Sequence, residues 1–121
     1  MSKPTRKTNQ SLVDVIGQLK DKSRETGSSL WRDVANRLNR SRSNWAQPNL
    51  SRLSRYAPED QTVLVPGKLL GSGEVERSHV IAAYSVSTGA RDKIEAAGGR
   101  VMTLGELMNE NPDGKEVFIL G

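Results

Sequence analysis

The segment VIAAYSVSTGARDKIEAA, residues 80–97, decides the fold class. Its first seven residues form a compact apolar run, which is typical of a buried β-strand. From Thr88 the pattern becomes helical, because Ala90, Ile94 and Ala97 fall on one side and a pair of glycines then ends the helix. A buried strand followed directly by an amphipathic helix predicts an α/β fold.

Strand and helix patterns also occur on both sides of this segment. Further short strands are predicted at Thr62–Val65, which Pro66–Gly67 should end, at Arg100–Met102 and at Val117–Leu120. Leu104, Leu107 and Met108 mark another short helix. Strands that alternate with helices predict a small layered α/β domain over residues 57–121.

The charge of the chain is distributed unevenly. Eighteen Lys and Arg stand against fourteen Asp and Glu, a net charge of +4. Residues 1–56 hold twelve of the bases and four of the acids (+8), whereas residues 57–121 hold six bases and ten acids (−4). We interpret residues 1–56 as a basic, helical, RNA-binding region and residues 57–121 as the compact part, together one structural unit. The alternative is a chance imbalance on solvated faces.

Helical patterns precede the compact part. Leu12, Val15, Ile16 and Leu19 form one stripe behind a candidate N-cap, Ser11, and Gly27 should end that helix. A second helix is expected after residues 28–29, and a third, short one after Pro48. The first eleven residues have no apolar side chain after Met1 and are expected to form a disordered or extended tail.

A basic loop is predicted between the second and third helices. Residues 39–48, NRSRSNWAQP, have no hydrophobic period and no acid. Arginine pairs with phosphates in a forked geometry, and the indole of Trp45 can stack on a base. Trp45 could equally fold back onto the domain, and the sequence leaves both interpretations open.

The composition excludes several classes of protein. The absence of cysteine excludes disulfides, thiol chemistry and cysteine-ligated metal sites, and a single histidine argues against a histidine-rich metal site. No apolar run reaches the roughly 18 residues of a membrane span, and no apolar block follows the basic N-terminus as in a secretory signal. We therefore expect a cytoplasmic protein without a membrane partner.

A glycine-rich stretch, PGKLLGSG at residues 66–73, suggests a phosphate-binding loop but lacks its pattern. Thr62 stands where a P-loop has its first glycine, Leu69 follows Lys68 where Ser or Thr is needed, and Glu76 replaces the third glycine of a dinucleotide fingerprint. We interpret the stretch as a sharp turn between strands, with glycines that permit close backbone approach. Its amides, beside Lys68, could still hold an RNA phosphate.

No residues suggest catalysis. His79 has no partner with nucleophile character and is expected at the surface or in a turn. Acid–base pairing needs two carboxyl groups close together in a cleft, and the spacing of the acids gives no such indication for Glu74, Glu76, Glu95, Glu106 and Glu110. We predict that the chain is not an enzyme and has no catalytic, metal or cofactor site.

Several motifs resemble those of a known family. The pattern Lys68-Leu-Leu-Gly-x-Gly-x-Val75, an apolar strand, and then Val86-Ser-x-x-Ala-x-x-x-Ile-x-x-x-Gly98 resembles the signature of bacterial large-ribosomal-subunit protein fifteen and its relatives. Upstream motifs narrow the resemblance to the archaeal and eukaryotic protein eighteen-e family, archaeal by length: Trp31-x-Asp-Val-Ala35, Asn49-Leu-Ser-Arg-Leu53 and Val63-x-Val-Pro-Gly-Lys68. The resemblance extends from about Ser11 to the C-terminus. Departures occur at Asn36, Trp45 and Pro48.

The resemblance implies a structural constituent of the large ribosomal subunit. Its expected fold is a small layered domain of irregular β-β-α turns, and its expected partners are large-subunit ribosomal RNA and neighbouring ribosomal proteins. No cofactor, small-molecule substrate or functional homo-oligomer is implied. The alternative is a free-standing RNA-binding or ribosome-assembly factor, which would share the composition.

RNA recognition should depend mainly on backbone and shape, because basic side chains are many and aromatic ones few. The candidate RNA contacts are basic residues, with one Trp, and all but one lie in residues 1–56: Lys3, Arg6, Lys7, Arg24, Arg32, Arg37, Arg40, Arg42, Trp45, Arg52, Arg55 and Lys68.

Overall fold

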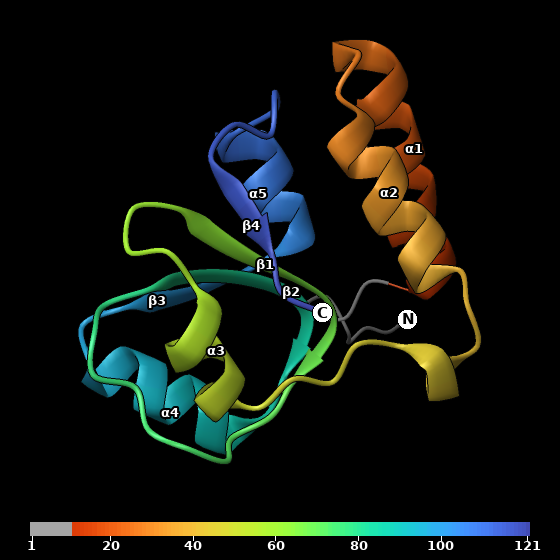
Figure 1. The fold of residues 1–121 in the computed structure, drawn as a ribbon. Helices are drawn as coiled ribbons and strands as arrows, with labels where there is room; N and C mark the ends of the chain where they lie inside the picture. Colours follow the sequence, from red (N-terminus) through yellow and green to blue (C-terminus); the bar gives the residue numbers. More distant parts are fainter. Residues whose placement is uncertain (1–10) are drawn as a thin grey trace, which may run out of the picture.

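The computed structural model describes residues 11–121, so most of the expected tail lies outside the described residues. Figure 1 shows the elements in chain order. They are α1 (Leu12–Thr26), α2 (Ser29–Leu38), the 3-10 helix η2 (Arg42–Asn44), α3 (Leu50–Tyr56), β1 (Thr62–Leu69), β2 (Val80–Val86), α4 (Thr88–Ala96), β3 (Arg100–Thr103), α5 (Leu104–Glu110) and β4 (Val117–Ile119).

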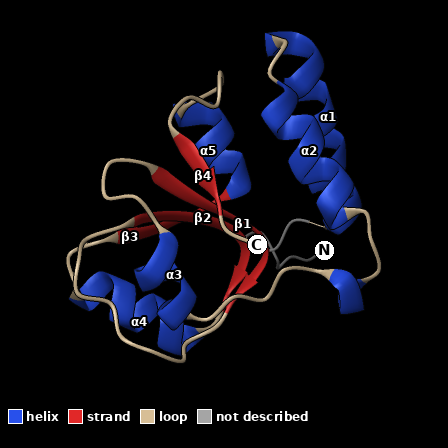
Figure 2. Cartoon of the chain, in the orientation of Figure 1, coloured by secondary structure: helices blue, strands red, loops and turns tan. Residues whose placement is uncertain are grey.

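The four strands form one parallel sheet in the order β3-β2-β1-β4. Helices α1, α2 and α5 cover one face of the sheet, and α3 and α4 cover the other (Figure 2). A parallel sheet buried on both faces is the usual arrangement, because its crossover segments lie over the faces. The α/β class and the layered arrangement predicted from the sequence are confirmed.

Alternate residues of each strand enter different cores, as the two-residue period of a strand requires. Leu64 and Ala82 pack under α1, α2 and α5, whereas Val63, Val65 and Ile81 pack under α3 and α4. Both cores combine side chains from residues 11–56 with side chains from residues 57–121. The basic helices therefore form two layers of the domain.

The expected helix ends are confirmed for α1. The Ser11 hydroxyl accepts a hydrogen bond from the Asp14 amide at 3.1 Å, and Gly27 ends the helix with a φ of 77°. Helix α5 begins with a capping box, in which Thr103 and Glu106 each accept the other's main-chain N–H.

Strand β1 corrects one prediction, because it does not end at Pro66–Gly67 but continues to Leu69. Its register against β2 shifts between Val65 and Lys68, so Pro66 and Gly67 occupy an irregular part of the ladder. Proline is tolerated at such bulges because its missing N–H is not needed there. Gly67 pairs with Ala46, and a Cβ at Gly67 would lie only 2.1 Å from the Ala46 carbonyl oxygen.

The glycine-rich stretch is also corrected: it is not a sharp turn. Because β1 and β2 are parallel, residues 70–79 must return along the sheet before β2 begins, and they do so as coil. The Lys93 ammonium donates to the carbonyls of Gly71 and Gly73 at 3.0 and 2.8 Å. Gly73 has a φ of 107°, and a Cβ there would lie 2.5 Å from the Ser51 nitrogen, so the expected close backbone approach is confirmed.

Candidate nucleic-acid interface

The basic side chains fall into a paired and an unpaired group. Within residues 11–121, ion pairs involve Lys22, Arg24, Arg37, Arg77, Arg91 and Arg100. Lys93 is bound to main-chain carbonyls. The remaining described bases form no ion pair with a described carboxylate, and most of them lie between residues 32 and 68: Lys20, Arg32, Arg40, Arg42, Arg52, Arg55, Lys68 and Lys115. This stretch of the chain therefore presents positive charge that the described carboxylates leave without ion pairs.

Helix α2 and the loop after it carry the first part of this unpaired charge. Arg32, Arg40 and Arg42 are exposed, as expected for side chains outside the apolar row of α2. Arg37 differs because it forms an ion pair: its Nε lies 3.1 Å from the Oδ1 of Asp33, one helical turn earlier. Such a partly exposed pair contributes little stability, so Arg37 can exchange Asp33 for another anion at small cost.

Trp45 folds back onto the domain. Its indole Nε1 donates to the carbonyls of Leu38 and Arg40 at 3.1 and 3.2 Å. Its ring meets the Tyr84 ring edge-on, with centroids 5.4 Å apart, and the Arg42 guanidinium lies 4.9 Å above it. Of the two interpretations left open by the sequence, the structure has the one in which Trp45 packs on the domain.

Helix α3 carries the second part of the unpaired charge. Arg55 is exposed, and the Arg52 guanidinium lies 5.0 Å from the centroid of the Tyr56 ring. Arg52 also donates to the Gly121 carbonyl at 3.4 Å, and a Cβ built on Gly121 would lie 3.3 Å from an Arg37 nitrogen. Gly121 therefore brings together arginines from α2 and α3, although these helices cover opposite faces of the sheet.

Lys68 is exposed where β1 runs beside the basic loop. Two amides of the glycine-rich stretch, those of Lys68 and Leu70, are already engaged, because they donate to the carbonyls of Ala46 and Pro48 at 3.1 and 2.9 Å. The backbone there fixes the basic loop against the sheet. The Lys68 ammonium is the group at this position that can meet a phosphate.

The remaining candidate residues are Lys3, Arg6, Lys7 and Arg24. Lys3, Arg6 and Lys7 are outside the described residues. Arg24 is near the end of α1 that adjoins the turn to α2, whereas Arg40 follows the opposite end of α2 (Figure 1). Arg24 also pairs with Asp21. The structure therefore does not join Arg24 to the loop arginines in one surface.

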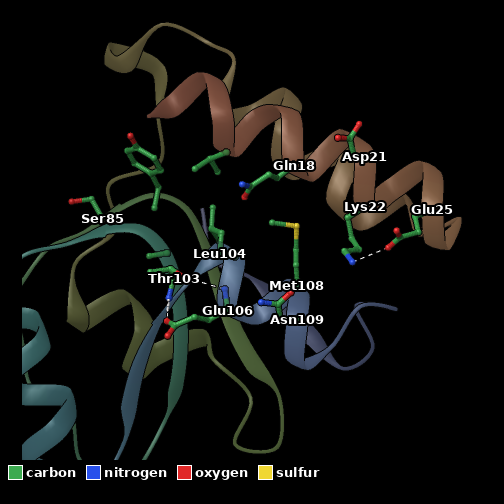
Figure 3. Close-up of a pocket in the computed structure, with 14 residues that line it drawn as sticks. Gln18, Asp21, Lys22, Glu25, Ser85, Thr103, Leu104, Glu106, Met108 and Asn109 are labelled. Atoms are coloured by element: carbon green, nitrogen blue, oxygen red, sulfur yellow. Dashed lines mark hydrogen bonds and ion pairs between the residues drawn. The ribbon is translucent and has the colours of Figure 1, made fainter. Parts of the chain in front are cut away.

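A groove of about 820 Å³ lies between α1, α5 and the ends of β2 and β3 (Figure 3). Its carboxylates already have partners: Asp21 pairs with Arg24, Glu25 pairs with Lys22, and Glu106 accepts the Thr103 amide. His79 does not line the groove. These contacts give the groove no pair of unengaged carboxylates and no base beside a nucleophile, so nothing in it supports an enzyme active site.

His79 corrects another prediction, because it is buried rather than at the surface or in a turn, with 4% of its area exposed. Burial lowers the pKa of His79, and the nearby Arg77 guanidinium lowers it further, against a smaller opposing effect of Glu59. Its Nδ1 has no hydrogen-bond partner among the described residues. His79 immediately precedes β2, and its main-chain carbonyl accepts a hydrogen bond from the Arg100 amide at 3.0 Å. His79 is therefore a buried polar residue next to the sheet.

Between residues 11 and 121, no three His, Asp or Glu side chains come together as a metal site would require. No helix in that range combines the length and the apolar character needed to cross a membrane.

The fold and the unpaired arginines define a small α/β protein with a surface suited to a polyanion. The family model described as "Ribosomal protein 60S L18 and 50S L18e" matches residues 2–121. Curated relatives carry the name "Large ribosomal subunit protein eL18". The one from Methanothermobacter thermautotrophicus is 47% identical over 114 residues, 94% of each chain. The one from Halobacterium salinarum is 46% identical over 94% of this chain and 97% of the relative.

A third relative of that name, from Methanosphaerula palustris, is 47% identical over 99% of both chains. The chain belongs to the ribosomal protein L18 and L18e family. The family resemblance inferred from the sequence motifs is confirmed.

Proposed function

We infer that the chain is a structural constituent of the large ribosomal subunit. In that role it binds large-subunit ribosomal RNA, contacts neighbouring ribosomal proteins and acts in the cytoplasm as part of the ribosome. This function consists of binding RNA and protein, and it involves no catalysis. Membership of the L18 and L18e family, whose relatives match over nearly the whole chain, supports this function.

The unpaired bases between residues 32 and 68 carry the proposal that this surface meets RNA. Lys and Arg that neutralise phosphates release condensed counterions, and this release supplies much of the binding free energy. The described carboxylates do not pair with these side chains, so no ion pair has to break before they bind. We propose that the RNA contacts include the unpaired Arg32, Arg40, Arg42, Arg52, Arg55 and Lys68. Arg24 and Arg37 join them by exchanging Asp21 and Asp33 for phosphate, and Lys3, Arg6 and Lys7 are added from outside the described range.

Recognition is then mainly of the RNA backbone and its shape. The chain has only five aromatic residues, and Trp31 is completely buried. Arginine on a rigid scaffold can bind two phosphate oxygens at once, which fixes position and orientation without reading the bases.

Sucrose-gradient sedimentation of a cell lysate at low and high salt tests this function. A ribosomal constituent remains with the large subunit at high salt, at about one copy per particle. A chain that leaves the subunit at moderate salt and sediments with free RNA would instead support a ribosome-assembly factor. In the second case the proposed structural role is wrong even though the family is correct.

A further inference from the structure

The loop between α2 and α3 presents two exposed arginines without a carboxylate to hold them. Arg40 and Arg42 lie in residues 39–49, whose only regular element is the three-residue helix η2. A basic loop of this kind has to lose conformational freedom when it binds a phosphate backbone, and that loss weakens binding. Contacts that already order the loop in the unbound protein reduce this loss.

Trp45 ties this loop to the end of α2. The last carbonyls of a helix lack partners within the helix. Leu38 is the final residue of α2, and the Trp45 indole N–H donates to its carbonyl as well as to that of Arg40. One donor therefore satisfies a helix end and fixes the main chain at the first arginine of the loop.

The ring of Trp45 also holds the second arginine. The Arg42 guanidinium lies 4.9 Å from the ring centroid, within the range of a cation–π contact. A guanidinium stacked on a ring keeps its N–H groups at the edge, where they can still donate to a phosphate. Tyr84, at the end of β2, meets the indole at an interplanar angle of 78° and supports it from the sheet.

We propose that Trp45 is a positioning residue, which orders Arg40 and Arg42 for phosphate contacts instead of stacking on an RNA base. Its N–H and one ring face are already used within the protein, so stacking on a base through that face would require Arg42 to leave. This inference rests on the proposed function, because it assumes that the loop arginines meet ribosomal RNA.

A double-mutant cycle tests the proposal on the full chain. The probe is protein-free large-subunit ribosomal RNA from Methanothermobacter thermautotrophicus, the source of one of the relatives. Trp45→Leu is compared in the natural chain and in an Arg40→Ala/Arg42→Ala background. We expect about five- to tenfold weaker binding in the natural chain and less than about twofold further loss in the background. Equal losses in both backgrounds would mean that Trp45 contacts RNA itself, and would overturn the proposal.

Hydrogen exchange in the absence of RNA supplies an independent readout. The amides of residues 44 and 45 donate to the carbonyls of Ser41 and Arg42 within the loop. We expect Trp45→Leu to accelerate exchange at residue 44 by about tenfold, while amides of β2 remain protected. Unchanged exchange in the loop would also contradict a positioning role.

Trp45→Phe covers the case in which Trp45→Leu does not fold. It keeps a ring for Arg42 and Tyr84 but lacks the N–H that binds Leu38 and Arg40. We expect a smaller loss of affinity, about two- to fivefold, that again disappears in the Arg40→Ala/Arg42→Ala background. A natural chain that does not bind the RNA at all would overturn the proposed function, whereas additive losses would overturn the role of Trp45 alone.

Discussion

His79 shows how a single buried residue links stability to pH. Its unfolded pKa is near 6.5, and burial in the folded protein lowers that pKa. Between the two values the unfolded chain binds more protons than the folded one. The free energy of unfolding is therefore highest above the unfolded pKa and decreases as the pH falls through 6.5 toward the lower folded pKa.

Urea unfolding between pH 5.5 and 7.5 measures this contribution. We expect the free energy of unfolding to rise with pH in the natural chain and to be flatter in His79→Leu, which cannot titrate there. The same slope in both proteins would show that another group is responsible.

The backbone conformation of Gly73 and its close approach to Ser51 leave no room for a side chain at this position. Because its φ is 107° and Ser51 lies against it, Gly73→Ala should lower the free energy of unfolding by about 1–3 kcal/mol. Gly17 is the matched control, since a Cβ there meets nothing within 4 Å and the residue lies inside α1. Gly17→Ala should raise stability by about 0.5–1 kcal/mol. In thermal melts, the melting temperature should fall for Gly73→Ala and rise for Gly17→Ala. An unchanged melting temperature of Gly73→Ala would contradict the close backbone approach.

At the level of elements, Lys93 joins helix α4 to the coil between β1 and β2. Its two hydrogen bonds to the carbonyls of Gly71 and Gly73 predict that Lys93→Met lowers the free energy of unfolding by about 1–2 kcal/mol. Arg91→Met on the same helix should change it by less than about 0.5 kcal/mol, because Arg91 is exposed and lies 3.9 Å from Glu95. Chemical denaturation compares the two, and equal effects would mean that Lys93 does not hold the coil.

The elements also show which structural features a sequence pattern can specify. Strand β2 and helix α4 were predicted well, because a long apolar run and a repeated three- and four-residue spacing are local signals. The continuation of β1 through Pro66 and Gly67 was missed, since it depends on a bulge and on Ala46 from another part of the chain. The burial of His79 and the anchoring of Trp45 depend on tertiary contacts in the same way.

For the whole molecule, the distribution of unpaired charge predicts where RNA binding is most sensitive. Arg40→Glu/Arg42→Glu should weaken binding to large-subunit ribosomal RNA about 10- to 100-fold and reduce the salt dependence by about one for each lost phosphate contact. Arg91→Glu/Lys115→Glu changes the net charge by the same amount, but both residues lie outside the stretch of unpaired bases between residues 32 and 68. We expect a loss of less than about threefold for that control.

Filter binding at several salt concentrations gives both quantities for each variant. Equal losses would refute a localised interface and leave only a general effect of net charge. Lys93 is unsuitable as a control here, because its side chain holds the coil before β2.

The candidate interface could be predicted only in part from the sequence. The excess of bases in residues 1–56 indicated the correct region, because charge is additive and visible in composition. The sequence analysis did not separate paired from unpaired bases, although the spacing of Arg24 from Asp21 and of Arg37 from Asp33 is a local helical signal. The meeting of Arg37 and Arg52 at Gly121 required the complete sheet.

The parallel order β3-β2-β1-β4 has a consequence for synthesis of the chain. Strand β1 pairs with β4, whose residues 117–119 follow all the other elements in sequence. During translation β1 can therefore join β2, and residues 46–49 can pair with its other edge near Gly67 and Leu70, while Thr62–Leu64 on that edge stay open until β4 leaves the exit tunnel. An unpaired strand edge can join another chain. We therefore expect the Thr62–Leu64 edge to be open to pairing with another chain until β4 is made, which would favour early binding of the nascent protein by a chaperone or by RNA.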